Sequence, residues 1–178
     1  MTPATSSGQR RPRLEDEERL AAWRNLQWTT SLIMGRFAAD LGRSGLTLEE
    51  FDVLVHLAWS PDGVLPLRRL VSSLVLGHLL TRSGLTRILD RMERNGLVVR
   101  TLSTSDRRQF DVTLTRNGRA VFDSVWAEHV EGLRRYFMDP LTDDDVRALR
   151  AILAKLIAAN EAEARAARGV APVAEEAS

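Results

Sequence analysis

Hydrophobic side chains recur at helical spacing along most of the chain, in stretches separated by short polar or glycine-containing turns. Apolar residues three, four or seven positions apart give each stretch one apolar face, which is typical of an amphipathic helix. The predicted helices cover residues 14–41, the stretch from 47 to the turn at 60–63, 67–76, 81–94, 115–137, and a last helix from 142 onward whose apolar repeat is close to a heptad.

Between the fourth and fifth predicted helices the pattern changes from helical spacing to alternation. Residues 97–102 form a short apolar run, and Phe110, Val112 and Leu114 alternate with polar residues. The two runs predict a β-hairpin whose tip, residues 103–108, is basic. A hairpin directly behind a helix-turn-helix makes a winged helix. The predicted fold class is therefore mainly α with a small β-hairpin wing.

Local signals at the helix ends support this assignment. Thr47 followed by Glu50 fits a capping box, in which the hydroxyl and the carboxylate bind free backbone N–H groups reciprocally. Asn95 and Gly96 end the fourth helix, because glycine tolerates the left-handed backbone found there. Thr115 is expected to cap the fifth helix.

Positive charge is concentrated in the middle third of the chain. Residues 66–119 contain 11 arginines and four acids, an excess of +7, whereas residues 1–65 and 120–178 have net charges of −2 and −4. Such a concentration is the electrostatic footprint of a polyanion-binding module. The alternative is a basic face that is merely solvated.

Composition excludes several classes of protein. Without cysteine there is no disulfide framework or thiolate metal site, and no apolar run approaches the ~20 residues of a membrane span. The three histidines are scattered, so we expect no metal site. No nucleophile elbow, phosphate-binding glycine loop or paired catalytic carboxylate is present, so we expect neither an enzyme nor a cofactor. With no signal-peptide pattern, we expect a cytoplasmic protein.

Four stretches together resemble the MarR family of bacterial transcription regulators, a likeness that covers about residues 20–158. Residues 46–54 begin the second helix, and residues 81–98 form the fourth helix and the first wing strand. Residues 105–120 form the wing and the start of the fifth helix, and residues 140–144 begin the last helix. One segment departs from the family pattern: Leu74 to Leu80 is about four residues longer than usual.

The resemblance implies a homodimer that binds a pseudo-palindromic DNA operator. It assigns residues 46–115 to the winged helix-turn-helix DNA-binding domain, and residues 14–45 and 116–165 to a helical dimerisation region. The polar, non-periodic ends, residues 1–13 and 166–178, are expected to be a disordered arm and tail.

Candidate DNA contacts follow from the geometry of a recognition helix, whose N-terminal residues lie nearest the base edges. Ser83, Thr86 and Arg87 are expected on bases, and Arg82 on a phosphate. Farther along this helix we expect two arginines on a solvated face, Arg91 and Arg94, with the latter paired to Asp90.

The wing supplies the second set of candidates. The family places the arginine that matches Arg108 in the minor groove, where a narrow groove concentrates negative potential. Arg107 either contacts a phosphate or points to solvent. Asp106 would be repelled by phosphate, so we expect it to orient an arginine.

A ligand site is implied by the family alone. Its members often bind phenolic or other anionic aromatic effectors in a crevice between the dimer helices and the winged domain. The candidates for that crevice are Trp23, Trp28, Phe51 and His56, although helical spacing makes core packing the alternative for the aromatics.

These patterns favour a dimeric DNA-binding repressor that is released by a small ligand. Two other functions stay open: a sequence-tolerant architectural DNA binder, and a degenerate winged helix that serves as a protein-interaction module. The arginines Arg82, Arg87 and Arg108 argue against the second alternative.

Overall fold

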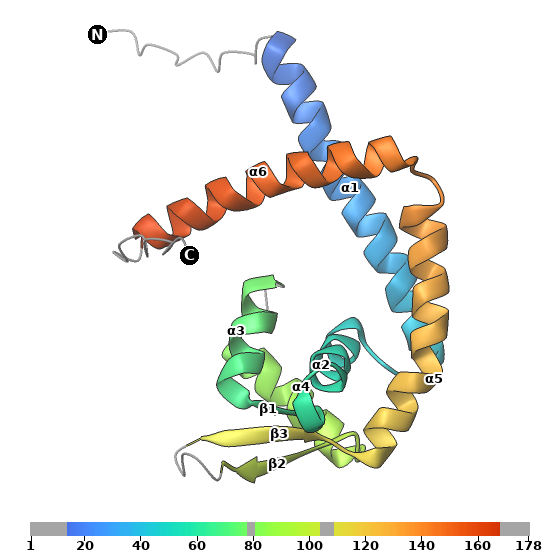
Figure 1. Cartoon of the computed structure of the whole chain (residues 1–178), viewed down its shortest axis with the longest axis vertical. Helices are drawn as coiled ribbons and strands as arrows, with labels where there is room; N and C mark the ends of the chain where they lie inside the picture. The colour runs from blue at the N-terminus through green and yellow to red at the C-terminus, as the bar shows by residue number, and fades with distance from the viewer. Residues whose placement is uncertain (1–13, 78–80, 104–108, 168–178) are drawn as a thin grey trace, which may run out of the picture. The chain divides into compact units, whose positions relative to one another are not determined.

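The computed structural model describes residues 14–77, 81–103 and 109–167. They belong to two compact units, and the boundary along the chain lies between residues 132 and 133. The predicted arm at 1–13 and residues 168–178 of the predicted tail lie outside the described residues, whereas residues 166 and 167 are helical. Figure 1 shows the elements, which in chain order are α1 (Leu14–Arg43), α2 (Leu48–Ala58), a 3-10 turn (Pro61–Gly63), β1 (Val64–Pro66), α3 (Leu67–Gly77), α4 (Arg82–Arg94), β2 (Val98–Leu102), β3 (Phe110–Leu114), α5 (Arg116–Leu133), a π-helix (Arg134–Met138) and α6 (Asp143–Ala167).

The predicted fold class, mainly helical with a small β wing, is confirmed, but the sheet has one more strand than predicted. The strand order is β1-β3-β2, all antiparallel, with Arg100 of β2 opposite Val112 of β3. The additional strand β1 pairs with β3, with Val64 opposite Thr113. The predicted hairpin of β2 and β3 is confirmed, and β1 was not predicted because a strand of three residues is too short to show alternation.

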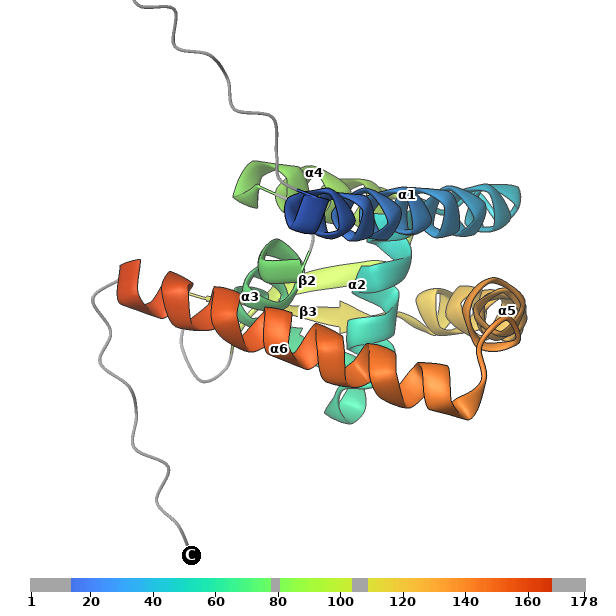
Figure 2. The ribbon, with the colours of Figure 1, turned by 90° about the horizontal axis from the view of Figure 1, so that it is seen from above.

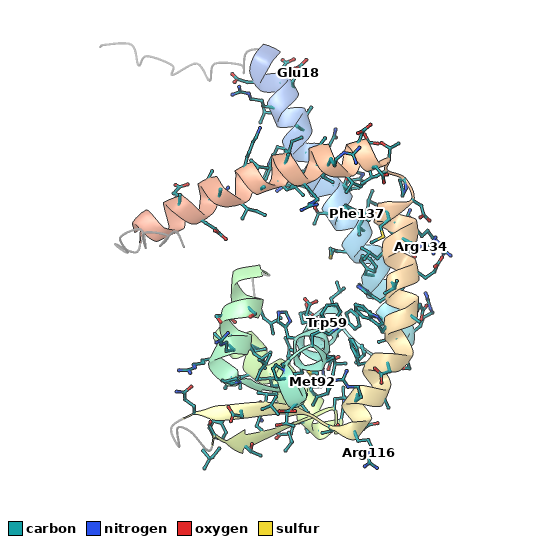
Figure 3. All side chains as sticks on the ribbon, viewed as in Figure 1. Glu18, Trp59, Met92, Arg116, Arg134 and Phe137 are labelled. Atoms are coloured by element: carbon teal, nitrogen blue, oxygen red, sulfur yellow. The ribbon has the colours of Figure 1, made fainter. Side chains whose placement is uncertain are left out.

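One hydrophobic core lies in the first unit, between α2, α3, α4, the sheet and the beginning of α5. Figure 2 shows α2 between the strands and α5, and Figure 3 places the fully buried Met92 among these elements. The largest fully buried side chains are Leu54, Leu57, Leu70, Leu74, Leu85, Leu89, Met92 and Glu50. Glu50 is the single carboxylate in this group, and its contacts are part of the candidate site.

The fifth helix begins directly on the turn that ends α4. The Thr115 hydroxyl donates to the carbonyl of Gly96 at 2.7 Å and accepts the N–H of Gly118 at 2.8 Å, which confirms Thr115 as the cap. Gly118 is pressed against the backbone of Leu97, so a Cβ placed on it would lie 2.0 Å from the Leu97 carbonyl oxygen. Glycine is therefore required at this contact.

The helical pattern changes at the start of the second unit. The prediction extended the fifth helix to residue 137, but the α-helix ends at Leu133 and a π-helix follows. The Asp139 N–H donates to the carbonyl of Arg134, an i→i+5 bond that widens the turn by one residue. Apolar spacing in the sequence does not reveal such a widening.

Within the described residues, no helix combines the length and apolar character needed to cross a bilayer.

His129 of α5 lies in an aromatic environment between α1 and α2. Its ring centroid is 4.8 Å from that of Phe37, 4.5 Å from that of Phe51 and 5.7 Å from that of Trp126. The Nδ1 atom is buried and has no hydrogen-bond partner among the described residues. Burial lowers the pKa of His129 below its usual 6.5, and the negative charge of Asp52 opposes this shift in part.

Replacing Gly118 with alanine is expected to lower the free energy of unfolding by about 2 kcal/mol, because the added methyl group overlaps a backbone carbonyl. Gly42→Ala is the matched control, since a Cβ there meets nothing within 4 Å. Urea denaturation of both variants measures the difference. Equal stability of the two would show that α5 does not press on the turn as described.

The neutral state of His129 should make the protein less stable as the pH falls below about 6.5. The unfolded chain then binds a proton that the folded protein resists, so the free energy of unfolding decreases with decreasing pH. His129→Phe is expected to flatten this dependence between pH 7.5 and 5, measured by urea midpoints. The pKa values of Glu93 and Asp145 are lowered from about 4.5 and 3.8, so their contributions change only at more acidic pH. An unaltered pH dependence in His129→Phe would contradict the assignment.

Candidate nucleic-acid interface

The fourth helix has one buried face and one exposed face. Leu85, Leu89 and Met92 are at most 1% exposed and lie in the core. On the opposite face Ser83, Thr86 and Arg87 are all exposed. The structure therefore places these three predicted base-contacting residues on the surface of one helix; Figure 1 shows this helix beside the sheet.

The beginning of α4 is capped in a way that exposes its first turn. The Thr81 hydroxyl accepts the N–H of Gly84 at 3.1 Å, and the hydroxyls of Thr81 and Ser83 are 3.0 Å apart. Polar hydroxyls thus surround the positive end of the helix dipole, where a phosphate oxygen is favoured. The prediction for the Arg82 side chain lies outside the described side chains.

The base of the wing is well defined. Ser103 donates its N–H to the carbonyl of Gln109 at 2.9 Å, which closes the hairpin just before its tip. The tip itself, with the predicted contacts Asp106, Arg107 and Arg108, lies outside the described residues. The structure thus fixes where the tip begins and ends, at the free end of β2 and β3.

A buried carboxylate connects the recognition helix to α2. Glu50 is 2% exposed; its Oε2 accepts the N–H of Thr47 at 3.0 Å, which completes the predicted capping box. Its Oε1 accepts Nε of Arg91 at 2.6 Å, and Nη2 of that arginine donates to the Thr47 hydroxyl at 3.2 Å. The predicted solvated face describes Arg91 only in part: its side chain is 44% exposed, but its guanidinium also pairs with a buried acid, which was not predicted.

A second cluster connects the recognition helix to the wing. Nη2 of Arg100, on β2, lies 2.6 Å from Oδ1 of Asp90 and 2.6 Å from Oε2 of Glu93. Its backbone N–H donates to Oε1 of Glu93 at 3.0 Å. Hydrogen bonds from Arg100 lower the pKa of Glu93 below its usual value.

This cluster replaces the predicted pair of Asp90 with Arg94. Nε of Arg94 donates instead to the backbone carbonyl of Asp90, at 3.3 Å, while the carboxylate binds Arg100. Sequence reasoning missed Arg100 because helical spacing rules describe pairs within one helix, and this arginine lies on a neighbouring strand. It also missed two exposed arginines in the first turn of α3, Arg68 and Arg69, which add positive charge beside α4.

The four residues proposed to contact a ligand do not lie in similar surroundings. Trp23 and Trp28 are on α1 and are 55% and 67% exposed. Phe51 lies in the core, with its ring centroid 6.2 Å from that of Phe122. His56 is partly buried, and its Nδ1 lies 2.8 Å from the carbonyl oxygen of Asp52.

A groove of about 390 Å³ lies between the helix-turn-helix and the wing. Its lining is mostly apolar and comes from α3, α4, β3 and the residue before β3: Leu67, Arg68, Val71, Leu85, Thr86, Gln109 and Phe110. None of the four candidate ligand residues contributes to this lining.

The chain is similar in sequence to known transcription regulators. The sequence pattern of the MarR family matches residues 44–109, which include α2, α3, α4 and β2. The HTH-type transcriptional regulator PecS of Dickeya dadantii is 33% identical over 113 residues, which cover 62% of this chain and 64% of PecS. The chain thus matches slightly less than two thirds of that relative's length.

Two solved structures have a similar fold. Sco3205 of Streptomyces coelicolor, a MarR family transcriptional regulator in complex with DNA, has a TM-score of 0.73 and 28% identity, covering 84% of this chain and 91% of that one. CouR of Rhodococcus jostii, bound to p-coumaroyl-CoA, has a TM-score of 0.62 and 29% identity, covering 74% and 87%. The similarity to both extends well beyond the helix-turn-helix.

Arg91→Ala is expected to lower the free energy of unfolding by about 2 kcal/mol, because the buried Glu50 carboxylate loses its bond to the guanidinium and keeps only the bond from the Thr47 N–H. Arg94→Ala, on the exposed face of the same helix, should change it by less than about 0.5 kcal/mol. Thermal and urea denaturation of both variants measure the effect. If Arg91→Ala proved as mild as Arg94→Ala, the connection to α2 would be unimportant for stability.

Proposed function

Because the chain belongs to the MarR family of bacterial transcription regulators, we propose that it is a homodimeric, sequence-specific DNA-binding regulator, a repressor that a small aromatic or anionic ligand releases. The observation that carries this proposal is the exposed polar face of α4. It presents Ser83, Thr86 and Arg87 beside a wing and within the most basic third of the chain. The DNA complex of Sco3205 supports DNA as the partner.

In the proposed complex the beginning of α4 enters the major groove. Arg87 binds a guanine edge bidentately, while the hydroxyls of Ser83 and Thr86 donate to or accept from neighbouring bases. Arg82 contacts a phosphate. The wing enters the adjacent minor groove with Arg108, oriented by Asp106, and Arg107 lies near the backbone.

Apolar faces of the long helices support a homodimer. Large hydrophobic side chains of α1 are 38–67% exposed: Leu20, Trp23, Leu26, Trp28, Leu32 and Met34. In the second unit Ile152, Leu156 and Ile157 of α6 are also exposed, at 48–58%. Residues 14–45 and 116–165 would bury these faces between two copies. Two recognition helices related by a two-fold axis require a pseudo-palindromic operator.

The ligand part of the proposal rests on a similar regulator, since CouR was solved with p-coumaroyl-CoA, an aromatic acyl thioester. Exposed indole surfaces favour an aromatic ligand, and Trp23 and Trp28 offer such surface on α1. Phe51 and His56 would lie deeper, on the α2 side. A second copy of the chain would complete the crevice.

DNA binding can be tested with the chain's own upstream region by fluorescence anisotropy at several salt concentrations. Arg87→Ala should weaken specific binding by about ten- to a hundredfold and relax the preference at one base pair, since a bidentate base contact is worth about 1–3 kcal/mol. Arg147→Ala is the control, because this exposed arginine pairs with Asp144 at the start of α6.

Each alternative function has its own outcome in this experiment. Equal competition by random DNA would indicate a sequence-tolerant architectural binder. Absence of salt-dependent binding would indicate a protein-interaction module, because phosphate contacts always release counterions.

A further inference from the structure

The recognition helix carries two acids on the side that faces the wing, which is unexpected for a helix that approaches phosphates. Asp90 and Glu93 both direct their carboxylates to one guanidinium, that of Arg100 on β2. Nε of Arg100 also lies 3.1 Å from Oε2 of Glu93. Nη2 therefore binds both carboxylates, and Nε adds a second bond to Glu93, a fork of two donors that the single ammonium of lysine lacks.

Charge and exposure show that Arg100 is not available as a phosphate contact. One guanidinium beside two carboxylates gives the cluster a net charge of −1, which does not attract a phosphate. The Arg100 side chain is only 24% exposed, and its Nη2 and Nε atoms already donate to carboxylates. Its positive charge thus serves to offset acids of the helix.

The position of Arg100 in the sheet gives the cluster a mechanical consequence. It is the middle residue of β2, opposite Val112 of β3, and its backbone N–H as well as its side chain bind Glu93. In the described part of the chain β2 is an edge strand, so no strand there restrains it on its other side. The cluster thus fixes the position of β2 along the axis of α4.

We propose that Arg100 is a positioning residue that sets the wing relative to the recognition helix, through Asp90 and Glu93, and does not itself contact DNA. This inference rests on the proposed function, since it concerns how the two DNA-reading elements are held in register. A wing held in register delivers Arg108 to the minor groove while α4 occupies the major groove.

The first test uses DNA binding and a double-mutant cycle. Arg100→Ala should weaken operator binding about tenfold or more and should reduce the dependence of log K on log salt by the same amount as Arg108→Ala. Its effect should not add to that of Arg108→Ala, because a displaced wing has already lost the Arg108 contact. Arg100→Lys should restore only part of the affinity, because its ammonium can replace Nη2 between the two carboxylates but not the additional Nε bond to Glu93. Arg147→Ala, whose guanidinium pairs with Asp144 at the start of α6, is the control.

Other results of this cycle would overturn the proposal. If the double variant lost about one more unit of salt slope than Arg108→Ala alone, with additive effects on affinity, Arg100 would be identified as a direct phosphate contact.

The second test needs no DNA and separates this proposal from the proposed function. Amide hydrogen exchange of the free protein should become faster in residues 98–102 for Arg100→Ala, with the core amides of α2 unaltered and Arg94→Ala like wild type. If the wild-type protein failed to bind DNA specifically but Arg100→Ala still showed faster exchange in residues 98–102, the proposed function would fail and the positioning role would stand. Unchanged exchange in β2 would overturn the positioning role.

Discussion

The buried stripe of α4 is the constraint on which the rest of the structure depends. Leu85, Leu89 and Met92 recur along one side of the helix and are almost completely enclosed by α2, α3, the sheet and the beginning of α5. Enclosing this side forces the opposite side, with Ser83 and Arg87, into solvent. Every element that packs around the stripe therefore also fixes the direction of the exposed polar face.

Electrostatic pairing across elements then decides which charges of α4 are available to a partner. Glu50 binds Arg91 from the α2 side, and Arg100 binds both acids of the helix from the wing side. Arg87 and Arg94 remain on the exposed face. A helix with four arginines and two acids thus presents a predominantly positive exposed face, because both acids pair with an arginine of β2.

The winged part of the chain buries its apolar surface better than the long helices α1 and α6 do. The winged part of the first unit is well packed, whereas α1, and α6 in the second unit, keep rows of large apolar side chains in contact with water. A partner that covered this surface would stabilise the complex by roughly 25 cal/mol for each Å² of apolar area that it buried. A second copy of the chain is the proposed partner because the symmetry of an operator requires two recognition helices.

Periodicity, capping signals and charge determined the helices, the hairpin and the polar face of α4 from the sequence alone, because each depends on residues within a few positions of one another. Strand β1 and the partners of Arg91 and Arg100 were decided by the tertiary structure. The side chains of Arg91 and Glu50 are 41 residues apart in the chain. Packing of α4 on α2 brings them together, and no local pattern encodes that contact. Local rules choose the elements, and burial chooses which charged groups meet.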